Sequence, residues 1–220
     1  MSAAAFVHDN RVNQFTWQYP EWWALALSAA AWLSMLQRHA HHRAPMVQWM
    51  VMTAAMMFPM ITSPLRATAE RSLWKRRHRA ILGFLIGYVA CWLIAGIVIV
   101  LMRVPSRAEV AIGALVIAGA WQLTRTKRFA LSGCHFMIPL APCGWRADRD
   151  CVAYGWLVGT RCVVSCWALM LACFVTGHSL MAMAGLTAIC AIERYTRRPN
   201  QLLLGGALFA AALVQAVVLF

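Results

Sequence analysis

Methionines recur with helical spacing in the stretch MVQWMVMTAAMMFPM, residues 46–60, which holds six of the chain's thirteen methionines. At about 100° per residue, four of them fall within roughly 80° of one another on a helix, with a fifth beside the stripe: Met46, Met50, Met57 and Met60, flanked by Met56. Thioethers are soft ligands of the kind that select Cu(I), and they are also adaptable fillers of an apolar core. The stripe therefore indicates either a soft-metal site or plain packing.

A second sulfur-lined face is expected in the apolar stretch CVAYGWLVGTRCVVSCWALMLACFV, residues 151–175. Cys162, Cys166 and Met170 lie within about 80° of one another on a helix, on the face that also carries Gly155 and Gly159. Thiolates and thioethers together suit Cu(I), whereas buried cysteine is also an ordinary small apolar residue. We expect this face and the methionine stripe to face each other, and packing remains the alternative for both.

Two further groups of possible ligands lie near the ends of the apolar stretches. On the predicted outer side the chain offers imidazole and thioether groups, which take copper in either oxidation state: His39, His42, Met46 and His178. On the predicted inner side, Cys134 and Cys143 are expected to be free thiols available to metal, although their spacing is not that of a CxxC zinc motif. For the exposed histidines, a solvated polar turn is the alternative.

One charge falls inside an apolar stretch. Arg161 lies near the middle of its predicted helix, where a charge is costly and normally faces a partner inside the bundle. Glu193 is the nearby acid that the sequence offers. We therefore predict an ion pair between them, with binding of a substrate anion as the less favoured alternative.

The elements that must hold these side chains are membrane-spanning helices. Of the 220 residues, 62% are hydrophobic and only 12% are charged, about half the usual share of charge in a soluble domain. Several apolar runs approach the length that crosses a bilayer. The chain is therefore predicted to be all-α, a single integral membrane domain over residues 1–220, with helices at 22–36, 46–62, 80–102, 108–124, 152–176, 178–192 and 200–220. Pro59 cannot donate a hydrogen bond to the carbonyl of Ala55, which predicts a kink near Met56.

The basic residues predict the orientation of this bundle. With seven spans, 15 of the 20 Lys and Arg residues fall on the side of the N-terminus and 4 on the other side. This asymmetry places the N-terminus in the cytoplasm. The net charge of +13 is thereby explained as a topology signal, so nucleic acid is not an expected partner and the lipid bilayer is. Two glycine pairs, Gly83 with Gly87 and Gly155 with Gly159, predict close helix contacts.

Enzymatic signatures are missing from the sequence. It contains no serine-hydrolase elbow, P-loop, HExxH motif or Rossmann fingerprint. Aspartate and glutamate total only 7, and no acidic pair falls inside a predicted span. General acid–base catalysis within the membrane is therefore unsupported, and a non-enzymatic function is favoured.

Three elements of the chain resemble a known family: MTAAMMFPM at 52–60, the stretch from Gln122 through Lys127 to Cys143, and CVVSCWALM at 162–170 with Glu193 beyond it. They look like the DUF2182 family of bacterial proteins, described as metal-binding integral membrane proteins, over roughly residues 50–195. The chain departs from that pattern at Ser165, where the family has a second cysteine, and at Ser179–Met183. The resemblance implies a metal-binding, multi-pass protein of the bacterial inner membrane.

Three functions are compatible with these features. The favoured one is Cu(I) handling by binding, delivery or transport, with another transition metal possible and with a metallochaperone or another membrane subunit as a possible partner. The alternative is a non-catalytic accessory or assembly subunit of a larger membrane complex. The third is a thiol–disulfide redox protein that uses Cys134 and Cys143 as an exchanging pair.

Overall fold

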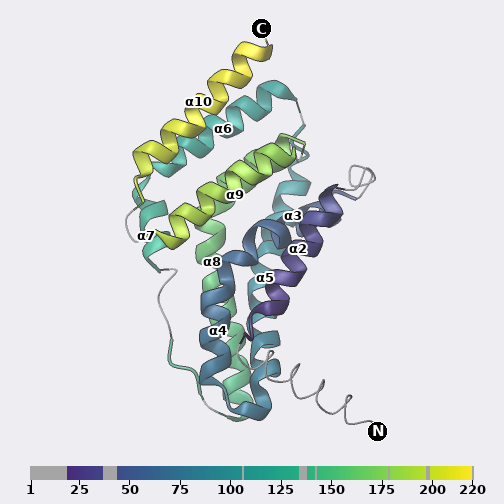
Figure 1. Cartoon of the computed structure of the whole chain (residues 1–220), viewed down its shortest axis with the longest axis vertical. Helices are drawn as coiled ribbons and strands as arrows, with labels where there is room; N and C mark the ends of the chain where they lie inside the picture. Colours follow the sequence, from purple (N-terminus) through teal and green to yellow (C-terminus); the bar gives the residue numbers. More distant parts are fainter. Residues whose placement is uncertain are drawn as a thin grey trace, which may run out of the picture.

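The computed structural model describes residues 19–36, 44–105, 107–133, 138–141, 143–177, 179–196 and 199–219, and these residues fold into helices without any strand. Figure 1 shows the long helices α5 and α8 side by side, with α6, α9 and α10 as an inclined layer at one end. In chain order the elements are α2 (Trp22–Leu36), α3 (Pro45–Met57), η2 (Pro59–Ile61), α4 (Thr62–Arg71), η3 (Trp74–Arg76), α5 (Arg77–Leu101), α6 (Ala108–Gln122), α7 (Arg125–Gly133), α8 (Gly144–Val175), α9 (Leu180–Tyr195) and α10 (Gln201–Leu219).

The all-α prediction is confirmed, and each of the seven predicted segments contains a helix. Two short helices, α4 and α7, form where the sequence indicated inner loops. Both are too polar to register as apolar segments, yet each buries one side: α4 buries Leu65, Thr68 and Ala69, and α7 buries Lys127 and Ala130. Their stability comes from packing against the bundle rather than from their own hydrophobicity.

Three helices are long and apolar enough to cross a membrane: α5, α8 and residues 201–218 of α10. Helices α3 and α4 qualify together as a fourth, with a bend of 48° between residues 45–57 and 59–71. Helices α2 and α6 are apolar but shorter, with 15 residues each. The described residues therefore offer three to four candidate spans, and the seven-span topology and the orientation of the termini stay predictions.

The predicted kink at Pro59 is present and has a specific support. Helix α3 ends at Met57, and Pro59 begins the 3-10 turn η2. Proline has no N–H, so the carbonyl of Ala55 loses its usual partner inside the helix. Two side chains of α2 replace that partner: Ser28 Oγ donates to this carbonyl at 2.8 Å and Trp32 Nε1 at 3.1 Å. The break is thereby stabilised by the neighbouring helix.

One tryptophan of α3, Trp49, also packs against the long helices α5 and α8. Trp49 is fully buried, and its Nε1 donates to the carbonyl of Trp92 on α5 at 3.0 Å. The indole lies against Gly96, where an added Cβ would come within 2.4 Å of the ring, and it meets Phe174 of α8 edge-on. This packing fixes the rotation of α3 and therefore the direction in which Met57 points.

Helices α5 and α8 approach closely at the predicted glycine pairs. A Cβ added to Gly155 would lie 1.9 Å from the carbonyl oxygen of Phe84, and one added to Gly87 would lie 2.1 Å from that of Val152. Neither backbone can give way without separating the helices. The glycine spacing thus serves packing within one chain, as expected for small residues at helix interfaces.

Replacing Gly155 by alanine is expected to destabilise the protein by about 3 kcal/mol or more, because the added methyl group meets backbone rather than a movable side chain. Gly113→Ala on α6 is the matched control, since no atom of the described structure lies within 4 Å of its added Cβ. Thermal unfolding in detergent micelles should show a much lower melting temperature for Gly155→Ala and no decrease for Gly113→Ala. Equal melting temperatures would show that α5 and α8 do not meet in this way.

Candidate metal centre

Met57, at the kinked end of α3, lies against the sulfur-lined face of α8. Met57 Sδ lies 3.8 Å from the Sγ of Cys162, and both side chains are buried. The hydroxyl of Tyr88, from α5, lies 3.3 Å from the same Sγ. Three helices thus meet at one thiol, and the two predicted stripes face each other at this point.

One turn further along α8, Cys166 follows Cys162 on the same helix face and reaches a third cysteine. Cys166 Sγ lies 3.9 Å from the Sγ of Cys190 on α9, and the hydroxyl of Ser165 lies 3.4 Å from Cys166 Sγ. We call Met57, Cys162, Cys166 and Cys190 the sulfur cluster. All four side chains are buried, none more than 6% exposed.

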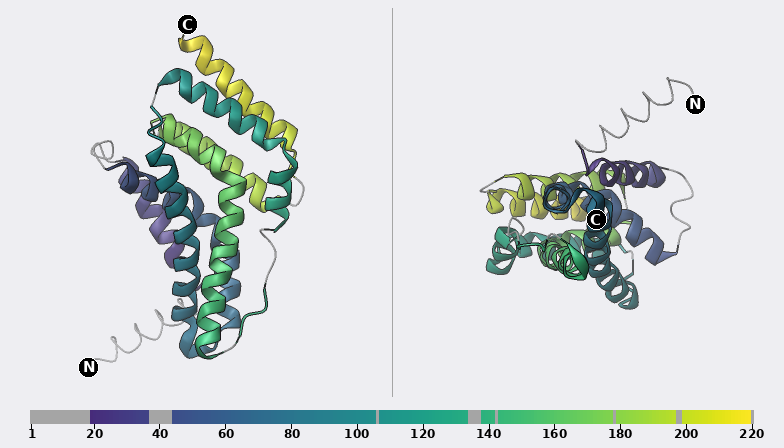
Figure 2. Two further views of the ribbon diagram at one scale, coloured as in Figure 1. Left: turned by 180° about the vertical axis from the view of Figure 1, so that it is seen from behind. Right: turned by 90° about the horizontal axis from the view of Figure 1, so that it is seen from below.

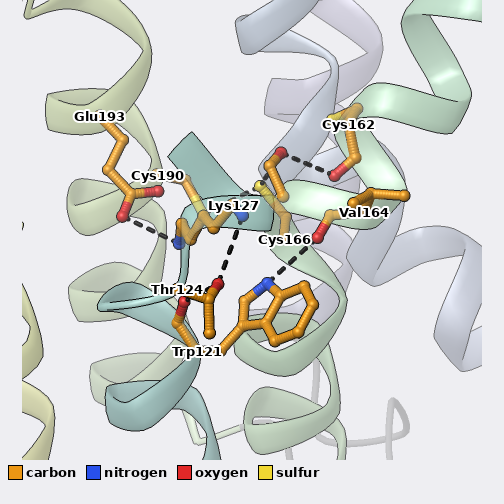
Figure 3. Close-up of polar contacts among 9 residues, drawn as sticks. Trp121, Thr124, Lys127, Cys162, Val164, Cys166, Cys190 and Glu193 are labelled. Carbon is orange, nitrogen blue, oxygen red and sulfur yellow. Dashed lines mark hydrogen bonds and ion pairs between the residues drawn. The ribbon is translucent and has the colours of Figure 1, made fainter. Parts of the chain in front are cut away.

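A buried ion pair lies beside the sulfur cluster (Figure 3). Lys127 Nζ lies 2.9 Å from Glu193 Oε1, and the two side chains are 0% and 1% exposed. The fully buried side chain of Gln122 lies against the same carboxylate. The positive charge of Lys127 acts on the thiols of Cys166 and Cys190, so sulfur ligands and an ionic group share one interior region.

Local contacts explain how α7 brings a lysine into the interior. Trp121 Nε1 donates to the carbonyl of Val164 at 3.1 Å, which holds the end of α6 against α8. The chain then turns at Thr124, whose Oγ1 accepts a hydrogen bond from the backbone N–H of Lys127 at 3.3 Å. The first turn of α7 therefore points Lys127 into the interior, where it meets Glu193.

The predicted pairing of Arg161 with Glu193 is wrong. The guanidinium of Arg161 donates to the backbone carbonyl of Gly133 at the end of α7, while Glu193 pairs with Lys127. The reason is that the segment predicted as an inner loop folds back into the bundle as α7. It supplies one partner for each charge: a carbonyl for Arg161 and an ammonium group for Glu193.

The sulfur separations suit a shared metal ion. Metal–thiolate bonds are about 2.3 Å long in zinc sites, so two sulfurs on one such ion lie about 3.7 to 4.6 Å apart as the angle between them widens from tetrahedral to linear. The Cys166–Cys190 distance of 3.9 Å and the Met57–Cys162 distance of 3.8 Å both fall in this range. Within the described ranges, no three His, Cys, Asp or Glu side chains form a group that could hold a metal. A mixed thiol and thioether set is what those residues bring together.

The other predicted ligands among the described residues lie outside the sulfur cluster, and they differ in how far they are buried. Met56 and Met170 are fully buried in the same core and Met60 nearly so, whereas Met46 and Met50 are half-buried on α3. Cys143 is exposed at the start of α8, 19 residues before Cys162, which corresponds to roughly 28 Å along a helix. It therefore does not belong to the sulfur cluster. Four predicted ligands lie outside the described residues: His39, His42, Cys134 and His178.

Sequence reasoning missed Cys190 and Lys127 as members of the centre. Cys190 stands alone in an apolar stretch, and its only cue is that Glu193 follows three residues later on the same helix face. Lys127 lies among other basic residues and reads as a topology signal. The pairing of either with α8 depends on tertiary packing.

Fold and site together define an all-helical protein with candidate membrane spans and a buried cluster of thiol and thioether side chains. A family model described as "PpoB2: Copper chaperone" matches residues 46–218. The chain therefore belongs to this copper-associated family, which carries a different name from the DUF2182 family that its motifs resemble. No curated protein and no solved structure matches the chain.

Proposed function

We propose that this chain is a membrane-embedded copper-handling protein that binds Cu(I) reversibly at the sulfur cluster. The observation that carries the proposal is the pair of close sulfur contacts, Met57 with Cys162 and Cys166 with Cys190, each at a separation that suits a shared ion and one helical turn apart on α8. Membership of a family of copper chaperones supports copper as the cargo.

The ligand chemistry favours the monovalent ion. Thiolates and thioethers are soft ligands, and they select Cu(I) over the harder first-row cations. The described part of the centre offers no imidazole, and its one carboxylate, Glu193, is already paired with Lys127. Metal binding requires thiols to lose their protons, and the ammonium group of Lys127 stabilises the negative charge that this creates.

The surroundings of the centre fit delivery rather than catalysis. Cys162 and Cys166 lie on the membrane-length helix α8, and Met57 lies on α3, which qualifies as a span together with α4. All four ligands are shielded from water, so a bound ion is protected until it is passed on. We propose that the ion exchanges with a partner protein in or at the inner membrane, either a metallochaperone or a membrane subunit. The outer histidines His39, His42 and His178, with Met46, remain a proposed entry site, and Cys134 with Cys143 a proposed inner one.

The family match favours copper handling over the two other functions compatible with the sequence. An accessory subunit would use small-residue faces and tryptophans for contacts with other chains, yet the glycine faces of α5 and α8 are used inside this chain. A thiol–disulfide redox protein would need Cys134 and Cys143 to meet; Cys143 is exposed at the start of α8, and Cys134 lies outside the described residues.

The test is Cu(I) binding by purified wild-type protein under reducing conditions, measured by competition with a chromogenic Cu(I) chelator. We expect the wild-type protein to bind about one ion tightly per chain. Met57→Leu should bind Cu(I) about tenfold more weakly, which corresponds to a loss of about 1.4 kcal/mol in binding free energy. Leucine has nearly the volume of methionine, so the fold should survive. Failure of the folded wild-type protein to bind Cu(I) would refute the proposal.

A further inference from the structure

A pocket of about 650 Å³ opens between α7, the end of α9 and the start of α10. Ten residues line it, and six of them carry polar or charged side chains. These are Arg128, Ser132, Glu193, Thr196, Asn200 and Gln201. The other four, Leu123, Leu131, Pro199 and Leu202, are apolar.

Glu193 belongs both to this pocket and to the buried region beside the sulfur cluster. It is a wall residue of the pocket, yet its side chain is only 1% exposed and pairs with the fully buried Lys127. Cys190 lies one helical turn before Glu193 on α9, and its Sγ lies 3.9 Å from Cys166. Glu193, paired with Lys127, therefore connects the pocket wall to the helix turn that carries Cys190.

We propose that this pocket is the portal through which Cu(I) reaches and leaves the Cys166–Cys190 thiols, with the Glu193 carboxylate as the transient contact between them. This rests on the proposed function and adds a route to it. The pair acts as a gate: an incoming cation competes with Lys127 for the carboxylate, and the ammonium group moves aside toward the thiolates that form.

The order of ligands along this route favours inward transfer. A carboxylate is a hard ligand and holds Cu(I) weakly, whereas thiolates are soft and hold it tightly. An ion that contacts Glu193 therefore gains affinity by moving one turn along α9 to Cys190. The return step is slower, and a partner with competing soft ligands at the pocket mouth would accelerate it.

The opposite side of the cluster is closed by packing. Met52, Met56 and Met57 are fully buried, and Trp49 fills the space between α3, α5 and α8. A second groove, of about 450 Å³ between α6, α9 and α10, is lined by Gly185 and Ala211 among others, and no member of the sulfur cluster lines it. That groove provides a control position on the same helix, α9.

The experiment fills the pocket from two walls without touching the cluster. Ser132 and Thr196 are both exposed, so Ser132→Trp and Thr196→Trp place an indole in the pocket without rearranging the core. Gly185→Trp in the other groove is the matched control. Stopped-flow measurement gives the rates at which each protein takes Cu(I) from a chromogenic chelator and returns it, and equilibrium titration gives the stoichiometry.

We expect both pocket variants to load and to release Cu(I) at least about tenfold more slowly than wild type, with unchanged stoichiometry and affinity. A blocked route slows both directions equally, so the rates change while their ratio does not. The control variant should match wild type. Wild-type rates in both pocket variants, at normal stoichiometry, would overturn the portal and leave the copper site intact. A wild-type protein that binds no Cu(I) would overturn the copper site itself, and the portal with it.

Discussion

Replacing Cys166 by serine should weaken Cu(I) binding by at least about a hundredfold, a loss of about 2.8 kcal/mol. Cys166 is the centre of the sulfur cluster, because it follows Cys162 by one turn on the same face of α8 and lies 3.9 Å from Cys190. A serine hydroxyl is similar in size to a thiol but is a hard, neutral ligand, so the metal site is lost while the packing is kept. Cys190→Ser should have a comparable effect, which sequence reasoning alone would not have suggested.

Cys91→Ser is the matched control for both cysteine variants. Cys91 is also buried between α5 and α8, where its Sγ donates to the carbonyl of Trp156 at 3.3 Å, a bond that serine can keep. Copper affinity should therefore remain at the wild-type value in this variant. If Cys166→Ser and Cys190→Ser bind Cu(I) as tightly as Cys91→Ser while folding normally, the sulfur cluster is only packing.

Replacing Lys127 by methionine is expected to destabilise the protein by about 3 to 5 kcal/mol, because it leaves the buried carboxylate of Glu193 without its partner. The double variant Lys127→Met with Glu193→Gln should recover most of that loss, since a neutral amide has no charge to compensate. Unfolding in detergent micelles, followed by circular dichroism, measures both. Two single losses that simply add in the double variant would show that the groups do not interact.

The exposed pair formed by Arg66 and Glu70 on α4 is the control for this cycle. Its atoms approach to 3.0 Å, similar to the buried pair, but its side chains are 49% and 57% exposed. Exposed ion pairs contribute little to stability because water competes for both groups. Glu70→Gln removes only this exposed pair, because Arg66 also contacts Glu21 at 3.6 Å. It should therefore leave the unfolding transition almost unchanged, which would show that burial causes the effect at Lys127.

The parts of the fold that depend on local sequence were predictable. Apolar segments gave the positions of the seven main helices, and the missing N–H of Pro59 gave the break after Met57, because each follows from a few neighbouring residues. The facing of Met57 and Cys162 was also predicted, since two narrow sulfur stripes on packed helices have few other arrangements.

The parts that depend on distant residues were not predictable in the same way. Helix α7 forms within a polar segment because Trp121 and Thr124 fix its start against α8. That placement alone decides that Lys127 pairs with Glu193 and that Arg161 contacts Gly133. Cys190 joins the cluster for the same reason: the packing of α9 against α8, and no local pattern, brings it to Cys166.

The most direct test of the account is X-ray absorption at the copper edge on the purified protein loaded with one equivalent of Cu(I). The account predicts an edge typical of Cu(I) and a first coordination shell of sulfur alone, with fewer sulfur neighbours in Cys166→Ser and an unchanged shell in Cys91→Ser. A first shell of nitrogen or oxygen, or a sulfur shell that both variants leave intact, would contradict the assignment of the sulfur cluster as the copper site.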